Sequence, residues 1–211
     1  MHVLVICDDF WHPSSTVRQG LAPLESQGYS FTWLENAKDW SAARLGGFPV
    51  TILAKSDNVS ATDQTPWITP DVENALLDYV RGGHGLLVIH SGTVGGQRCP
   101  TLRALVGGVF VSHPKQCPVT VIPRQGHPLT TGVAAFTETD EHYQMQLDDA
   151  QASVFLTSES GSAPRQPAGW TRSDGAGRVC VLTPGHNAAV WLQPGFQRLL
   201  INALSWCAPN D

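Results

Sequence analysis

The chain has 211 residues, of which 42% are hydrophobic and 15% charged, as expected for a globular domain and not for a disordered protein. Its formal net charge is −5 and it has no long basic run, which argues against a nucleic-acid partner. No stretch has the apolar length of a membrane helix, and the apolar start lacks a cleavage site. We therefore expect a single cytoplasmic domain over residues 1–211 with no membrane partner.

Short apolar runs alternate with helical patterns through the first half of the chain. In chain order, we expect strands over residues 2–7, 29–34, 48–53 and 85–89, and helices over 14–27 and 70–81. The second helix is the clearest, because Thr69 can cap it and Pro70 suits a first turn. This alternation predicts right-handed crossovers and a parallel sheet.

The second half is richer in predicted strands. In chain order, we expect a short helix over 102–106, strands over 119–122, 138–147, 153–157 and 178–182, and a closing amphipathic helix over 196–206. Residues 161–167 are rich in Gly, Ser and Pro and are predicted to form a loop. The sequence therefore predicts an α/β fold with a β-rich extension on one side of the sheet.

Three histidines follow predicted strands. Ligands of open α/β sheets bind outside the carboxyl ends of the strands, and His12, His90 and His186 all lie at such ends. We expect the three rings to share one rim of the sheet. The turn His90-Ser91-Gly92 would expose an imidazole, which can act as a base, an acid or a metal ligand. The alternative for each histidine is a structural role, as a polar residue that only forms hydrogen bonds at the end of a strand.

A second group of candidates is the run Asp140-Glu141-His142-Tyr143. On a regular strand, successive side chains point to opposite faces. Glu141 and Tyr143 would then share one face and Asp140 and His142 the other, so only one carboxylate could face a cleft. That carboxylate could orient a histidine, bind a metal or act as a base, whereas the alternative is a solvated edge strand.

Several common sites are not predicted. The five cysteines include no Cys-x-x-Cys pair, so we expect buried thiols and neither a disulfide framework nor a cysteine zinc site. Gly82-Gly83-His84-Gly85 precedes a strand and does not open a helix, so no nucleotide cofactor is expected. The Gly-x-Ser-x-Gly turn of α/β-hydrolases is also missing.

An ordered set of segments resembles the ThuA-like (trehalose utilisation) family, which is related to class I glutamine amidotransferases. The segments are residues 79–90, 105–114, 127–130, 140–143, 177–179 and 185–191, together with the first strand, His12 and the closing helix. The resemblance implies a flavodoxin-like (class I glutamine amidotransferase-like) fold, with a mostly parallel sheet and helices on both faces. His90 stands where the amidotransferases have their cysteine, and His186 where they have their histidine. Without a thiol there, we do not expect glutamine hydrolysis through a thioester.

The resemblance also implies a role in the use of trehalose or related disaccharides through their keto derivatives. We expect a hydrolase, lyase or isomerase that acts on a small sugar or keto-sugar, with His90, Glu141 and His186 as catalytic groups. A divalent metal such as zinc would be bound by His90, His113 and His186, with Glu141 as an alternative ligand. The residues expected to bind the sugar are Trp11, His12, Ser91, Asp140, Tyr143 and Trp191.

Two other functions stay open. Loss of the cysteine favours a non-catalytic sugar-binding or regulatory protein on an amidotransferase-like scaffold, since a fold alone carries no activity. Exposed tryptophans would also suit a subunit that docks to a partner enzyme or to further copies in a homo-oligomer. Residues 91–96 are glycine-rich where the family often has aromatic residues, which implies a different substrate pocket.

Overall fold

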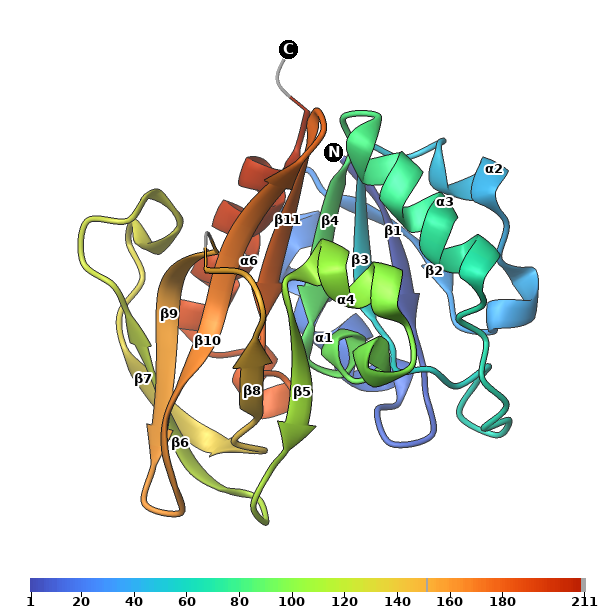
Figure 1. The fold of residues 1–211 in the computed structure, drawn as a ribbon. Helices are drawn as coiled ribbons and strands as arrows, with labels where there is room; N and C mark the ends of the chain where they lie inside the picture. Colours follow the sequence, from blue (N-terminus) through green and yellow to red (C-terminus); the bar gives the residue numbers. More distant parts are fainter. Residues whose placement is uncertain (151, 210–211) are drawn as a thin grey trace.

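The computed structural model describes residues 1–150 and 152–209. A nine-stranded sheet forms its centre, in the order β2-β1-β3-β4-β11-β10-β9-β6-β7 (Figure 1). The first five strands run parallel: β2 (Ser30–Leu34), β1 (His2–Cys7), β3 (Val50–Ala54), β4 (Gly85–Ile89) and β11 (Gly177–Leu182). The predicted α/β fold with parallel strands is confirmed, and the bounds of these strands differ from the predicted ones by at most two residues.

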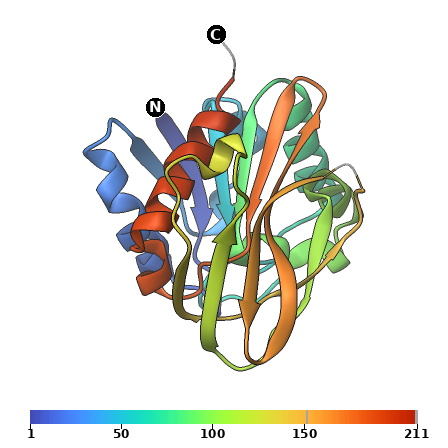
Figure 2. The same cartoon turned by 90° about the vertical axis from the view of Figure 1, so that its left-hand side faces the viewer.

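The sheet continues as an antiparallel extension made of β10 (Ala163–Asp174), β9 (Ser153–Ser160), β6 (Cys117–Pro123) and β7 (Phe136–Asp140). A separate two-stranded sheet pairs β5 (Gly108–Ser112) with β8 (Gln144–Leu147). Figure 2 views the molecule from the side of this extension. The predicted β-rich extension is therefore confirmed.

Two predictions within the extension are wrong. Residues 163–167, expected in a loop, belong to the long strand β10, whose pairing with β9 shifts register near Gln166 and Gly169. Such irregularities remove the period of two by which a strand is recognised. The single strand expected over 138–147 is two strands, β7 and β8, which belong to different sheets.

Helices cover both faces of the sheet (Figure 1). On one face lie α3 (Pro70–Arg81), α4 (Pro100–Val106) and the short α2 (Ala42–Leu45); on the other lie α1 (Ser14–Glu25), α5 (Ala188–Trp191) and α6 (Pro194–Cys207). Short 3-10 turns span Ala37–Asp39, His90–Thr93, Gly95–Gln97 and Pro128–Thr130. Thr69 caps α3 as predicted, since its hydroxyl accepts a hydrogen bond from the Val72 amide. Among the described residues, no helix is both long and apolar enough to span a bilayer.

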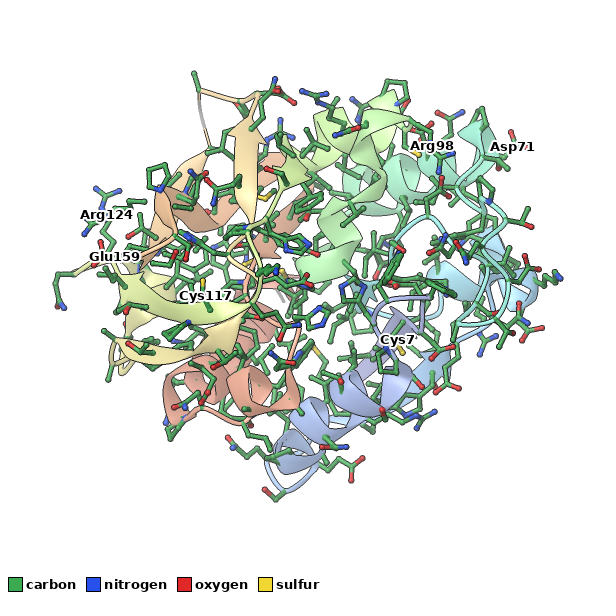
Figure 3. All side chains as sticks on the ribbon, turned by 90° about the horizontal axis from the view of Figure 1, so that it is seen from below. Cys7, Asp71, Arg98, Cys117, Arg124 and Glu159 are labelled. Carbon is green, nitrogen blue, oxygen red and sulfur yellow. The ribbon has the colours of Figure 1, made fainter. Side chains whose placement is uncertain are left out.

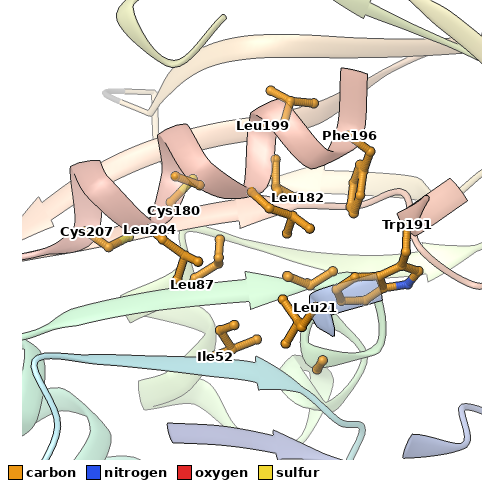
Figure 4. Close-up of a cluster of buried hydrophobic side chains, with 14 of the residues drawn as sticks. Leu21, Ile52, Leu87, Cys180, Leu182, Trp191, Phe196, Leu199, Leu204 and Cys207 are labelled. Atoms are coloured by element: carbon orange, nitrogen blue, oxygen red, sulfur yellow. The ribbon is translucent and has the colours of Figure 1, made fainter. Parts of the chain in front are cut away.

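Apolar side chains fill the space between the sheet and each helical layer. On the α1 and α6 side, Leu21 from α1 and Phe196 from α6 pack with Leu87 and Leu182 of the parallel strands (Figure 4). All four side chains are fully buried. This packing fixes the strand ends, and with them the loops that carry the histidines.

Substitution of Gly85 by alanine should destabilise the fold. An added Cβ at Gly85 would lie 2.2 Å from the carbonyl oxygen of Cys207, at the end of α6. Because backbone must move to relieve this clash, we expect a loss of about 1–3 kcal/mol in the free energy of unfolding, measured by chemical denaturation. Gly161→Ala is the control, since a Cβ there meets no atom within 4 Å. Equal stability of the two variants would contradict this close approach.

Candidate functional site

The carboxyl ends of β1, β4 and β11 meet at one edge of the sheet. Figure 3 views the molecule from this edge, with Cys7 marking the end of β1. His12, His90 and His186 follow these three strands, and their ring centroids are 4.9 to 5.6 Å apart. The structure thus brings together three imidazoles from loops that are distant in the chain.

His90 begins the turn after β4 in a left-handed backbone conformation, with φ of 46°, which is uncommon for a residue other than glycine. Its Nδ1 donates a hydrogen bond to the Thr183 carbonyl (2.8 Å), and the Tyr143 ring stacks on it with centroids 4.0 Å apart. The side chain is buried, at 2% exposure, so the expectation of an exposed imidazole is wrong. These contacts direct Nε2 of His90 toward Glu141, 3.4 Å away.

His12 is held by Asp9, a residue that the sequence analysis missed. Asp9 Oδ1 accepts hydrogen bonds from His12 Nδ1 (2.8 Å) and from the Trp11 and His12 amides, and Oδ2 accepts one from the Ser56 amide. Burial opposes ionisation of Asp9, but these bonds and the His12 charge outweigh it and lower the pKa of Asp9. Burial lowers the pKa of His12. The bond from Nδ1 to Asp9 orients the His12 ring, so that Nε2 faces the other two imidazoles.

Glu141 lies among the imidazoles. Its Oε2 is 3.2 Å from His186 Nδ1, 3.4 Å from His90 Nε2 and 3.7 Å from His113 Nε2. Burial opposes its ionisation, but contact with His186 and His90 prevails, so the pKa of Glu141 is held below its usual range. The same contact raises the pKa of His186.

Asp140 holds the backbone that carries His186. Its two carboxylate oxygens accept hydrogen bonds from the amides of Gly185 and His186, both 2.9 Å long, while burial raises its pKa. Asp140 thus binds backbone amides, whereas Glu141 contacts the imidazoles. Because β7 ends at Asp140 and β8 begins at Gln144, the alternation of a regular strand does not relate the two carboxylates.

Four residues form a group that could hold a metal ion. One ligand atom from each of His12, His90, Glu141 and His186 lies within 4.8 Å of the others; we call this group the His–Glu cluster. Among the described residues, Nε2 of His12, Nε2 of His90 and Nδ1 of His186 are buried without a partner in hydrogen-bond geometry. Neutral imidazoles with one carboxylate are common zinc ligands, and the bonds that orient His12 and His90 are typical of metal-ligating histidines.

His113 was expected in the metal site but lies outside the cluster. Its side chain is 34% exposed, and its Nδ1 donates to the Pro114 carbonyl. His12 and Glu141 occupy the positions around His90 and His186 that the prediction gave to His113. The signal for this was present in the sequence, because His12 also follows a parallel strand.

The residues expected to bind sugar separate into two groups. Trp11 is 66% exposed and, with His12, lines a pocket of about 280 Å³ beside the cluster. Ser91, Tyr143 and Trp191 are instead buried; the Trp191 indole donates to the Gly185 carbonyl (2.7 Å). Like Asp140, these three support the rim and are not available to stack on or bind a sugar, which corrects the expectation.

Acidification of the metal-free protein should lower its stability. The pKa values of His12, His127 and His142 are lowered, mainly by burial, from an ordinary value of 6.5. Below that pH the unfolded chain binds more protons than the folded one, so the free energy of unfolding falls as pH drops toward the folded pKa values. His186 acts oppositely, because its raised pKa gives stability below 6.5 that is lost as pH rises through the folded value.

Three histidines have a lowered pKa and one, His186, has a raised pKa. Chemical denaturation at about pH 7, 6 and 5 should therefore show a net loss of stability. The variant His12→Asn should show a shallower dependence on pH, because it lacks the most central of the three. Stability that increases over this acidification would contradict burial of neutral imidazoles.

Comparisons with known proteins place these features in context. A family model described as ThuA, trehalose utilisation, matches residues 2–207. A putative ThuA-like protein from Parabacteroides merdae superposes with a TM-score of 0.77 at 17% identity, over 98% of this chain and 89% of that one. A cytoplasmic protein from Salmonella typhimurium gives 0.73 at 14% identity over the whole of both chains. A β-galactosidase from Rahnella sp. R3 gives 0.66 at 17% identity, over 97% of this chain but 30% of its own. No curated protein matches the sequence significantly.

Proposed function

The chain belongs to the ThuA family of trehalose utilisation, and we propose that it is an enzyme that acts on a small sugar or keto-sugar at a divalent-metal site. The observation that carries the proposal is the His–Glu cluster, in which three buried ring nitrogens without hydrogen-bond partners surround one carboxylate. Nε2 of His90 and Nδ1 of His186 have only the Glu141 carboxylate near them, at 3.4 and 3.2 Å, and Nε2 of His12 has no partner among the described residues. Buried polar groups with poor pairing are costly, and a shared cation would satisfy all three. Cytoplasmic location and a sugar substrate are parts of this proposal.

The four residues of the cluster would hold the ion, with zinc as the best match to their nitrogen and oxygen donors. Such an ion polarises a carbonyl or hydroxyl oxygen, or lowers the pKa of water. Asp9 and the Thr183 carbonyl accept hydrogen bonds from Nδ1 of His12 and of His90, which leaves Nε2 of each ring for the ion. Asp140 holds the backbone of Gly185 and His186 in place.

In this proposal, His113 transfers a proton to or from the substrate. Its ring lies outside the cluster and is partly exposed, yet its Nε2 is 3.7 Å from Glu141 Oε2. An imidazole placed in this way can reach both solvent and a bound sugar, and imidazole is a common acid or base in proton transfer. A cleft-facing acid or base beside a polarised carbonyl fits hydrolysis, elimination or isomerisation of a keto-sugar.

The test combines metal analysis with turnover. Protein purified without metal resins should contain about one divalent ion per chain, and it should convert trehalose or its 3-keto derivative to a product detectable by mass spectrometry. Chelation should abolish turnover and added zinc should restore it. Turnover that is unchanged by complete metal removal would disprove the metal site. Sugar binding with no product from either compound would instead support the non-catalytic sugar-binding protein.

A further inference from the structure

The pocket beside the His–Glu cluster has polar walls that the proposed metal chemistry does not use. Its walls include Trp11, His12, Asp57, Gln97 and Arg98. His12 belongs to both the pocket and the cluster. A molecule bound in the pocket would therefore present one edge to the proposed metal ligands.

Arg98 is the most prominent group of this pocket. One of its guanidinium nitrogens, Nη2, donates to Asp57 Oδ2 (2.9 Å), while the Arg98 side chain stays 66% exposed. Asp57 is itself fixed, because its Oδ1 accepts hydrogen bonds from the Trp67 and Ile68 amides. Since a guanidinium has five N–H donors in a rigid plane, Arg98 is held by one bond and offers others to a ligand.

The charges of the pocket favour a neutral ligand. The buried carboxylate of Asp57 lies directly against the guanidinium, so a phosphate or carboxylate bound by Arg98 would also meet a negative charge. Hydroxyl groups carry no such penalty, and they can accept from Arg98 and donate to a neighbouring oxygen. Gln97 offers that oxygen, because its amide nitrogen donates to the Phe110 carbonyl (3.3 Å) and leaves Oε1 as an acceptor.

An aromatic surface completes the pocket. The exposed Trp11 ring is supported edge-to-face by Phe10, with centroids 4.7 Å apart. Apolar ring faces combined with planar polar side chains suit a pyranose, which has C–H faces and a rim of hydroxyls. At about 280 Å³, the pocket is just below the usual range for drug-sized ligands of roughly 300–1,000 Å³, which fits one ring better than two.

We propose that this pocket is a subsite for one neutral pyranose ring, which stacks on Trp11 and is oriented through its hydroxyls by Arg98 and Gln97. Asp57 is a positioning residue that holds Arg98 and lowers the affinity for anions. The inference rests on the proposed function, because it names the substrate class of that same site. Asp57, Gln97 and Arg98 would then belong to the sugar site together with Trp11.

Calorimetric titration with glucose, trehalose and glucose 6-phosphate tests the subsite. The wild type should bind glucose and trehalose more tightly than the phosphate, and Arg98→Met should weaken binding of both by about tenfold or more, as expected for loss of hydrogen bonds from a charged donor. Arg98→Lys keeps a cation beside Asp57 and should also weaken binding, because it lacks the planar fork.

Arg165→Met is a matched control. Arg165 is also an exposed arginine paired with a carboxylate, that of Glu159, and Glu159 and Arg98 lie on opposite sides of the molecule in Figure 3. Its sugar affinity should stay within about twofold of the wild type, since the substituted side chain is remote from the pocket. Thermal melts of all variants check that each remains folded.

The outcomes separate this inference from the proposed function. Sugar binding by the wild type that Arg98→Met and Arg98→Lys retain unchanged would overturn the subsite and leave the proposed function standing. Tighter binding of glucose 6-phosphate than of glucose, lost in Arg98→Met, would make the pocket an anion site and overturn its neutral character. A wild type that binds none of the three compounds would overturn the subsite, and the proposed function is then decided separately by metal analysis and by turnover of the 3-keto derivative.

Discussion

Replacement of His90 by asparagine should weaken zinc binding by more than about 100-fold. Loss of a hydrogen-bonded residue behind a metal ligand typically costs 10–100-fold in affinity, and His90 is proposed as a ligand itself, with Nε2 directed into the His–Glu cluster. Asparagine is chosen because it tolerates the left-handed backbone conformation of this position (φ of 46°) better than alanine. Competition with a fluorescent zinc chelator measures the affinity, and circular dichroism checks the fold.

His113→Asn provides the comparison for this experiment. His113 approaches Glu141 but does not belong to the cluster, so its zinc affinity should remain within about threefold of the wild type while turnover falls, as for loss of an acid–base group. A set of ligands made of His90, His113 and His186, as the sequence alone suggests, predicts equal losses of affinity for both variants. Equal losses would therefore reject the cluster seen in the structure.

The placement of the three histidines at one edge of the sheet could be predicted, because it depends only on the local sequence around each strand. An apolar strand followed by a histidine is visible at His12, His90 and His186 without any knowledge of long-range contacts. The rule that parallel strands end at one edge then places the three rings near each other. Four of the five parallel strands, β1, β3, β4 and β11, are largely buried and mostly apolar, which is the pattern of strands covered on both faces. The edge strand β2 is buried only at Leu34.

The carboxylates could not be placed in the same way. The position of Glu141 depends on the path of the chain between β7 and β8, which pair with partners in two different sheets. Asp9 follows directly after Asp8 at the end of β1, and nothing local distinguishes the carboxylate that holds His12 from its neighbour. Burial of Trp191 and Tyr143 likewise comes from close approach to distant residues, Gly20 and His90, so their availability to a sugar could not be judged from the sequence.

Lys55 shows how the strand ends are held beneath the site. It follows β3 and is fully buried. Its ammonium donates to the backbone carbonyls of Cys7 (3.3 Å), Asp8 and Glu35 (3.0 Å), which lie at the ends of β1 and β2. Asp8 has a left-handed backbone conformation, with φ of 74°. The lysine thus connects the ends of β1, β2 and β3 by hydrogen bonds. The end of β1 directly precedes Asp9, the residue that orients His12.

Substitution of Lys55 by methionine should lower the free energy of unfolding by about 3 kcal/mol. Methionine fills much of the same space but donates no hydrogen bonds, so three carbonyl oxygens at the strand ends lose a charged donor. Burial lowers the pKa of Lys55, and the nearby charges of Asp9 and Asp8 oppose this shift, so the charge is costly to bury. The change is measured by urea denaturation of the metal-free protein, so that loss of zinc affinity does not contribute.

Lys38→Met is the matched control, because Lys38 is an exposed lysine whose ammonium pairs with Asp63 (2.9 Å). Its stability should change by less than about 0.5 kcal/mol, since exposed ion pairs contribute little. If Lys55→Met is as stable as Lys38→Met, the carbonyls at the strand ends do not depend on the ammonium. If it is destabilised as expected but binds zinc as tightly as the wild type once folded, the strand ends hold the domain together without setting the position of Asp9 and His12. Weaker zinc binding in the folded variant would instead connect this buried lysine to the geometry of the cluster.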